Sequence, residues 1–201
     1  MIVVVASGKG GTGKTSVSVN LAKVIAGSVQ LLDCDVEEPN AHLFLRAESV
    51  DIEEVAIAVP DIDETRCDGC EKCVEFCEFN ALAAVGGVPL LFPELCHGCG
   101  GCELVCPQDA VREKPHRIGT IQTSRSGAIT LRTGLLDIGV SMASSLVHSV
   151  KQRMEAGITA ILDAPPGTAC PAVATLRGAD FVVLVTEPTP FGLNDLKLAV
   201  D

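Results

Sequence analysis

The N-terminal part of the chain alternates between apolar runs and one amphipathic stretch. Met1–Ser7 is apolar without alternation, which is typical of a parallel strand buried on both faces. Thr15–Ala26 has apolar residues at helical spacing, and Gly27 is suited to end that helix. Val29–Leu32 is a second short apolar strand. The order strand, glycine-rich loop, helix, strand predicts one βαβ unit. The expected apolar face of the helix consists of Val17, Leu21, Val24 and Ile25.

A similar alternation returns in the C-terminal part. Ile118–Ile138 is rich in β-formers and punctuated by glycines, and Ser141–Ala156 is helical. Together with the N-terminal unit this predicts an α/β fold with a mostly parallel, doubly wound sheet. Such a sheet normally has another strand or two, so we expect the C-terminal part to be incomplete. The remaining predicted elements are strands at Ile158–Leu162 and Phe181–Val185, and a helix that starts at Leu193–Val200.

Between these parts lies a cysteine-rich segment that repeats itself with an offset of 29 residues. Cys67, Cys70, Cys73 and Cys77 map onto Cys96, Cys99, Cys102 and Cys106, and Ala81 maps onto Ala110. Such a repeat predicts two similar halves. Pro60 and Pro115 flank the segment and suit the crossing points of an insertion. We therefore expect one α/β domain at residues 1–58 and 115–201, interrupted by a small α+β domain at residues 59–114.

The cysteine spacing is the ligand pattern of a bacterial-type ferredoxin with two 4Fe–4S clusters. The first three thiolates of each run are expected to hold one cluster, and the fourth is expected to reach the other cluster. Two structural zinc ions are the alternative, since four thiolates also satisfy tetrahedral zinc. The predicted ligand sets are Cys67, Cys70, Cys73 and Cys106 for one cluster, and Cys96, Cys99, Cys102 and Cys77 for the other. We expect Phe76, Phe79 and Phe92 to shield the clusters.

The composition of the chain limits the cellular compartment and the classes of partner that we expect. The chain has 201 residues, of which 47% are hydrophobic, so it can bury a core. Ten cysteines without a secretory signal indicate metal ligation in a reducing, cytoplasmic compartment. The formal net charge of −11 makes nucleic acid an unfavourable partner. No window approaches the length of a membrane span.

The loop after the first strand carries the chemistry of phosphate binding. Its glycines leave backbone N–H groups free to surround phosphate oxygens, and Lys14 supplies positive charge. The Thr15 hydroxyl and Asp163, at the end of a later strand, are expected to hold Mg²⁺. Gly167 is expected to contact the γ-phosphate. Asp33 and Asp35 end the second strand, and we expect Asp35 to orient the attacking water. The predicted nucleotide site comprises Gly8, Lys9, Gly10, Gly11, Thr12, Gly13, Lys14, Thr15, Ser16, Asp33 and Gly167.

Gly8–Thr15 resembles the deviant Walker A motif of the MinD/ParA/nitrogenase-iron-protein ATPases, whose marker is the early lysine, here Lys9. Asp33-Cys34-Asp35 is similar to their switch I, and Asp163-Ala164-Pro165-Pro166-Gly167 to their switch II. The whole chain looks like members that carry an inserted two-cluster ferredoxin domain. The resemblance implies that residues 1–58 and 115–201 form a P-loop ATPase domain. It further implies an ATP-dependent homodimer in which Lys9 reaches the partner's phosphates. It also implies that Asp35 activates the water, which makes Lys9, Lys14, Asp35 and Asp163 the catalytic candidates.

Three functions fit these features. The first is an ATPase whose nucleotide-driven dimer switch is coupled to electron transfer, since γ-phosphate contacts order switch loops and hydrolysis releases them. The second is a ferredoxin-like carrier in which the nucleotide only regulates docking to a redox partner protein that the sequence does not identify. The third is a positioning or cluster-assembly scaffold. ATPase activity that depends on reductant separates the first function from the others.

Overall fold

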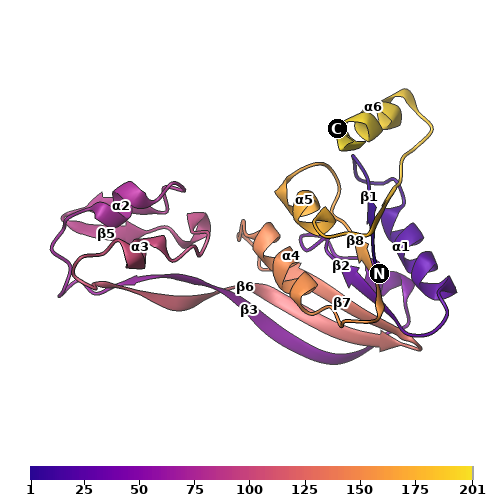
Figure 1. Ribbon diagram of the computed structural model, residues 1–201, viewed down its shortest axis with the longest axis horizontal. Helices are drawn as coiled ribbons and strands as arrows, with labels where there is room; N and C mark the ends of the chain where they lie inside the picture. The colour runs from indigo at the N-terminus through magenta and orange to yellow at the C-terminus, as the bar shows by residue number, and fades with distance from the viewer. Residues whose placement is uncertain (201) are drawn as a thin grey trace. The chain divides into compact units, whose positions relative to one another are not determined.

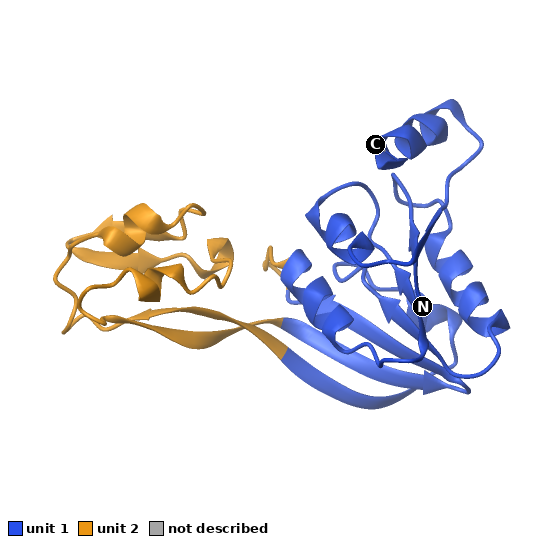
Figure 2. Cartoon of the chain, in the orientation of Figure 1, with its two compact units in different colours: residues 1–54, 119–137, 143–201 blue, residues 55–118, 138–142 orange. Residues whose placement is uncertain are grey.

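The computed structural model describes residues 1–200, which form two compact units (Figure 2). Unit 1 comprises Met1–Glu54, Gly119–Asp137 and the chain from Ala143 onward. Unit 2 comprises Val55–Ile118 and Ile138–Met142. Two long strands, β3 (Glu48–Ile62) and β6 (Val111–Ser126), run from one unit into the other. Within residues 1–200, no helix has the length and apolar character that a membrane crossing requires.

The main sheet has the strand order β3-β6-β7-β2-β8-β1-β9. Strand β1 is parallel to both β8 and β9, and β2 is parallel to both β7 and β8. Strand β6 is antiparallel to β7. The sheet is therefore mostly parallel, as the sequence predicts. The remaining strand bounds are β1 Ile2–Ala6, β2 Val29–Asp33, β7 Ile129–Leu136, β8 Thr159–Asp163 and β9 Phe181–Leu184.

Helices cover both faces of the central strands of unit 1 (Figure 1). Helix α1 (Lys14–Val24) packs over Val5, Leu31 and Ile161, which are fully buried in one core cluster. Helix α4 (Ala143–Gln152) contacts β7 and α5. Its Leu146 and Val150 are fully buried, and burial of such side chains contributes about 1.5–3 kcal/mol each. The other elements of this unit are the short helix η1 (Ala41–Phe44), α5 (Cys170–Leu176) and α6 (Pro190–Val200).

The buried face of α1 differs from the predicted apolar face. Val24 is 77% exposed, while Val19 and Ala22 are buried. Lys14 and Ser18 are buried with them. At the end of the phosphate loop, helix α1 turns polar side chains toward the sheet. A prediction based on apolar residues alone therefore assigns the wrong face of the helix to the core. Val17, Leu21 and Ile25 pack at the edge of the core.

Unit 2 is built from two similar halves. Helix α2 (Lys72–Phe76) and helix α3 (Gly101–Leu104) each follow a residue with left-handed backbone geometry, Glu71 and Gly100. Asn80 and Asp109 also correspond in the repeat, and both are left-handed, with φ of 52° and 47°. A two-stranded antiparallel sheet of β4 (Leu82–Val85) and β5 (Val88–Leu91) lies between the halves in the sequence, followed by the short helix η2 (Pro93–Leu95).

Candidate functional site

The parallel strands bring the predicted phosphate-site residues to one edge of the main sheet. Asp33 at the end of β2 is in register with Asp163 at the end of β8. Asp163 is also in register with Val5 of β1, and the glycine-rich loop begins after Ala6. Carboxyl ends of parallel strands are where ligands bind in open α/β sheets. The loop and the two aspartates therefore meet although they lie far apart in the sequence.

The start of α1 is fixed by hydrogen bonds to β8. Gly13 precedes the helix with φ of 91°, a left-handed geometry that favours glycine. The Ser18 hydroxyl donates to the Lys14 carbonyl at 3.0 Å and to Asp163 Oδ1 at 2.9 Å. The Thr15 side chain also hydrogen-bonds Asp163. Burial raises the pKa of Asp163, and the bonds to Thr15 and Ser18 oppose that rise. The two residues predicted to hold Mg²⁺ are thus in direct contact, an oxygen pair that fits this ion.

A cavity of about 310 Å³ lies over the phosphate loop. Asp35 lies on its wall, where burial raises the pKa of the carboxyl group to about 6 and the Lys14 charge opposes the rise. The other predicted site residues on the wall are Gly10, Gly11, Gly13, Lys14, Thr15 and Ser16. Pro166 of the predicted switch II is also on the wall. Sequence reasoning missed three further wall residues, Glu38, Asn40 and Phe44.

Asp33 contacts the backbone of the loop that carries Asp35. Its side chain is fully buried and accepts hydrogen bonds from the N–H groups of Asn40 and Ala41, each at 2.9 Å. The N–H of Asp35 lies 3.3 Å from the other carboxylate oxygen. Burial raises the pKa of Asp33 to about 7, although the N–H donors of Ala41 and Asp35 oppose the rise. Asp33 therefore holds the shape of the loop that carries two residues of the cavity wall, Asp35 and Asn40.

Two predicted phosphate contacts are engaged elsewhere in the single chain. The Gly167 N–H donates to the Ser7 carbonyl at 3.0 Å. Lys9 Nζ donates to Glu187 Oε2 at 2.8 Å. Gly8 packs so closely on the backbone of Asp195 in α6 that a Cβ atom there would collide with it. The first part of the phosphate loop is thus fixed by the segment that follows β9.

Two buried side-chain oxygens near the loop, Thr12 Oγ1 and Asn40 Oδ1, have no hydrogen-bond partner among residues 1–200. An unsatisfied buried acceptor costs about 1–3 kcal/mol, so such atoms favour a ligand. Asn40 lines the cavity and its N–H is held by Asp33. Its carboxamide oxygen is therefore available to accept a hydrogen bond from a ligand or water. Nothing in the sequence singles out Asn40 beyond its place after the second strand.

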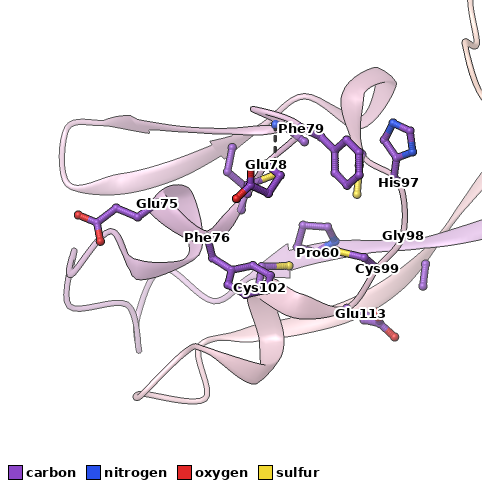
Figure 3. A pocket seen from close by; sticks show the side chains of 16 residues that line it. Pro60, Glu75, Phe76, Glu78, Phe79, His97, Gly98, Cys99, Cys102 and Glu113 are labelled. Carbon is purple, nitrogen blue, oxygen red and sulfur yellow. Dashed lines mark hydrogen bonds between the residues drawn. The ribbon is translucent and has the colours of Figure 1, made fainter.

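In unit 2, the end of each repeat contacts the start of the other repeat. The Phe92 N–H donates to the Ala81 carbonyl at 2.8 Å, and the equivalent Asp63 N–H donates to the Ala110 carbonyl at 2.7 Å. The cysteines are grouped in the same crossed manner around two cavities (Figure 3 shows the larger one). Cys77, Cys96, Cys99 and Cys102 line a cavity of about 520 Å³. Cys67, Cys70, Cys73 and Cys106 line a second cavity of about 10 Å³.

The thiol environment repeats as well. The Ala81 N–H donates to Cys77 Sγ and the Ala110 N–H donates to Cys106 Sγ, both at 3.3 Å. Hydrogen bonds to ligand sulfur are a usual feature of iron–sulfur sites. Burial raises the pKa of Cys73 and Cys96, and that of Cys102 to about 11. These thiols therefore stay protonated near neutral pH unless a metal takes the place of the proton.

The fit to a cubane differs between the two sets. The larger cavity has four thiols on its wall, together with the apolar rings of Phe76 and Phe79. The smaller cavity also has four thiols on its wall but must widen to hold a cluster. Phe92, which was expected to shield a cluster, is on the wall of neither of these two cavities. Within residues 1–200, no three His, Cys, Asp or Glu side chains converge closely enough to share a single metal ion.

The two cysteines outside the repeat have different settings. Cys34 is fully buried next to Asp33, and burial raises the pKa of its thiol. Cys170 is exposed at the start of α5. It lines a cavity of about 720 Å³ together with His148 and Arg177.

The fold and the loop define a P-loop nucleotide-binding protein. The sequence profile of the CobQ/CobB/MinD/ParA nucleotide binding domain matches residues 3–167. The chain therefore belongs to this family. It is 34% identical over 205 residues to MJ0579, an uncharacterised protein of Methanocaldococcus jannaschii, and the match covers 98% of this chain and 73% of that protein.

Two further similarities concern the fold and a short part of the sequence. The structure is similar to the septum site-determining protein MinD of Pyrococcus horikoshii, solved with Mg-ADP, with a TM-score of 0.50 and 18% identity. The match covers 99% of this chain and 63% of that one, so this chain spans less than two thirds of the MinD chain. At this identity the likeness establishes the fold. A stretch of 53 residues, 26% of this chain and 20% of the other, is 34% identical to a component of the ion-translocating oxidoreductase complex of Methanosarcina acetivorans.

Proposed function

We propose that the protein is an ATPase in which a nucleotide-driven dimer switch is coupled to electron transfer through two 4Fe–4S clusters. The observation that carries the proposal is the crossed grouping of the cysteines. The spacing predicts that the fourth cysteine of each run joins the first three of the other run. Cys77 lines one cavity with Cys96, Cys99 and Cys102, and Cys106 lines the other with Cys67, Cys70 and Cys73.

The nucleotide half of the proposal rests on the arrangement at the sheet edge. Lys14 would neutralise charge on the terminal phosphates, and the loop N–H groups would bind their oxygens. Thr15 and Asp163 would hold Mg²⁺, which supplies charge neutralisation when bound. Asp35 would position the attacking water through its carboxylate. Its pKa of about 6 leaves it mostly ionised at neutral pH, which is the state that accepts a proton.

The redox half rests on the chain's own residues around the two cavities. Four thiols spread over the wall of a 520 Å³ cavity suit a cubane, with iron at four corners. A single zinc ion would instead require all four thiolate sulfurs to lie about 2.3 Å from the metal. When bound, such clusters supply one-electron redox chemistry. The N–H donors of Ala81 and Ala110 would stabilise charge on the ligand sulfurs of Cys77 and Cys106. The short match to a component of an oxidoreductase complex supports the same interpretation.

The dimer is supported by Lys9. Two cations within one short loop repel unless both face anionic charge, and the phosphates in the nucleotide site of a second copy would supply it. This role follows the family resemblance. In one chain, Glu187 meets the Lys9 ammonium instead.

The test is the ATPase rate of the anaerobic protein with its clusters oxidised and reduced. The proposal expects hydrolysis to be several-fold faster in one redox state than in the other. Asp35→Ala should abolish hydrolysis in both states while ATP binding is retained, which serves as the control for contaminating activity. Redox turnover that is indifferent to ATP, with equal ATPase rates in both states, would favour the carrier with regulatory nucleotide binding.

A further inference from the structure

The two halves of unit 2 make the same contact with different chemistry. Asp68 corresponds to His97 in the repeat, and Gln108 corresponds to Phe79. Gln108 Nε2 donates to Asp68 Oδ2 at 2.9 Å. At the equivalent place the His97 ring stacks on the Phe79 ring, with centroids 3.8 Å apart and planes at 18° (Figure 3). One cysteine set is thus flanked by a charged, hydrogen-bonded pair and the other by an aromatic pair.

The charges on the cavity walls differ too. Glu75, Glu78 and Glu113 line the cavity of Cys77, Cys96, Cys99 and Cys102, and no lysine or arginine among residues 1–200 lines it. Asp68, Glu71 and Lys72 line the other cavity, so that a cation offsets one of its carboxylates. The formal charge of the lining residues is therefore −3 at the first cavity and −1 at the second. Without Glu75, whose side chain points outward (Figure 3), the charges are −2 and −1, so the first cavity is still the more negative.

Glu113 lies on the wall of the cavity that Cys96, Cys99 and Cys102 line. Its Oε1 packs against the backbone at Gly100, where an added Cβ would lie 3.0 Å from it. The equivalent residue in the other half is Ala84, and the equivalent of Glu78 is Pro107. Glu75, by contrast, points away from the cavity (Figure 3).

We propose that the two cluster sites are redox-inequivalent, with the site of Cys77, Cys96, Cys99 and Cys102 having the lower reduction potential. Reduction adds one negative charge, which nearby carboxylates oppose and a nearby ammonium favours. An electron given to the protein therefore resides mainly at the site of Cys67, Cys70, Cys73 and Cys106. The inference rests on the proposed function, because it assumes that both cysteine sets hold clusters.

The experiment is an anaerobic redox titration of the purified protein, followed by electron paramagnetic resonance. The wild type should titrate in two separate steps. Glu113→Gln should raise only the lower potential, shifting the electron distribution between the sites by at least about threefold. Asp68→Asn should raise only the higher potential. Glu75→Gln, which removes the same charge from a side chain that points outward, should leave both steps in place. Because these carboxylates are exposed, the Glu113→Gln shift should shrink in high salt.

Three results would overturn the inequivalence. They are a single two-electron step in the wild type, a Glu113→Gln shift confined to the higher potential, and a Glu113→Gln protein with unchanged steps at low salt. Iron and sulfide contents are measured on the same samples. A protein without sulfide would instead refute the proposed function, so the two failures are distinguishable.

Discussion

The ammonium group of Lys9 lies 2.8 Å from a carboxylate oxygen of Glu187 within one chain. The hydrogen bond to Glu187 raises the pKa of Lys9, so this side chain is charged at any physiological pH. The same ammonium is the group expected to meet phosphate of a second copy. In the proposed dimer, Glu187 and the nucleotide of the second copy would therefore compete for one cation.

We expect Glu187→Gln to lower the ATP concentration needed for dimerisation, because Lys9 no longer has a charged partner in its own chain. Lys9→Ala should leave ATP binding largely intact and abolish association. Both are measured by sedimentation or light scattering in an Asp35→Ala background, which should retain ATP. Glu48→Gln removes an exposed charge elsewhere and is the matched control. A dimer that forms equally well without Lys9 would contradict this role.

The crossed cysteine assignment makes a second prediction. The protein should carry about eight iron and eight sulfide atoms per chain, as two cubanes require. Cys77→Ser should perturb the cluster held by Cys96, Cys99 and Cys102, and leave the other cluster's paramagnetic signal unchanged. Cys170→Ser makes the same substitution at an exposed thiol outside both cavities and should change neither signal. Damage confined to the cluster of the first triplet would show that the ligands are not crossed.

Asp33 gives a pH dependence of stability in the nucleotide-free protein. Its pKa is raised from 3.8 to about 7 by burial, so the folded chain keeps a proton that the unfolded chain releases. Stability from this group is complete below pH 4 and falls as the pH rises toward 7, by up to roughly 4 kcal/mol from the shift alone. Asp33→Asn, which cannot ionise, should flatten this decline in urea titrations at a series of pH values. An identical pH slope in both proteins would refute it.

The sequence predicted the parallel strands and the helix faces that bury only apolar residues. Val3–Ala6 belong to the continuous apolar run that predicts the first strand, and Leu146 lies in the stretch predicted to be helical. Both are buried, because burial on a continuous apolar surface decides their placement. The inner face of α1 could not be predicted in this way. Lys14 and Ser18 are buried there beside Asp163, which comes from a strand far along the chain and accepts a hydrogen bond from Ser18.

The long strand β3 was also not predicted, and only the part of β6 from Ile118 onward lies in the predicted β-rich stretch. In β3, Val55 and Val59 are buried while Val50 and Ile52 are exposed, so its apolar residues do not share one consistent pattern of burial. At the candidate site, the motif residues Lys14 and Asp35 were found from local sequence. The role of Asn40 depends on Asp33 holding its backbone, which only the folded loop reveals.

Thermodynamic linkage provides the sharpest test of the proposed coupling between nucleotide and redox state. If reduction of a cluster changes the ATP dissociation constant, ATP binding must shift the midpoint potential of that cluster by the equivalent free energy. For one electron, a tenfold change in the dissociation constant corresponds to about 59 mV. The measurement is the midpoint potential of the anaerobic Asp35→Ala protein with and without saturating Mg-ATP, beside the ATP dissociation constant in each redox state. We expect a shift of at least one potential, matched by the ratio of the two dissociation constants. If the potentials with and without Mg-ATP are identical in a protein that holds both clusters and binds ATP, then ATP binding and the redox state of the clusters are not coupled.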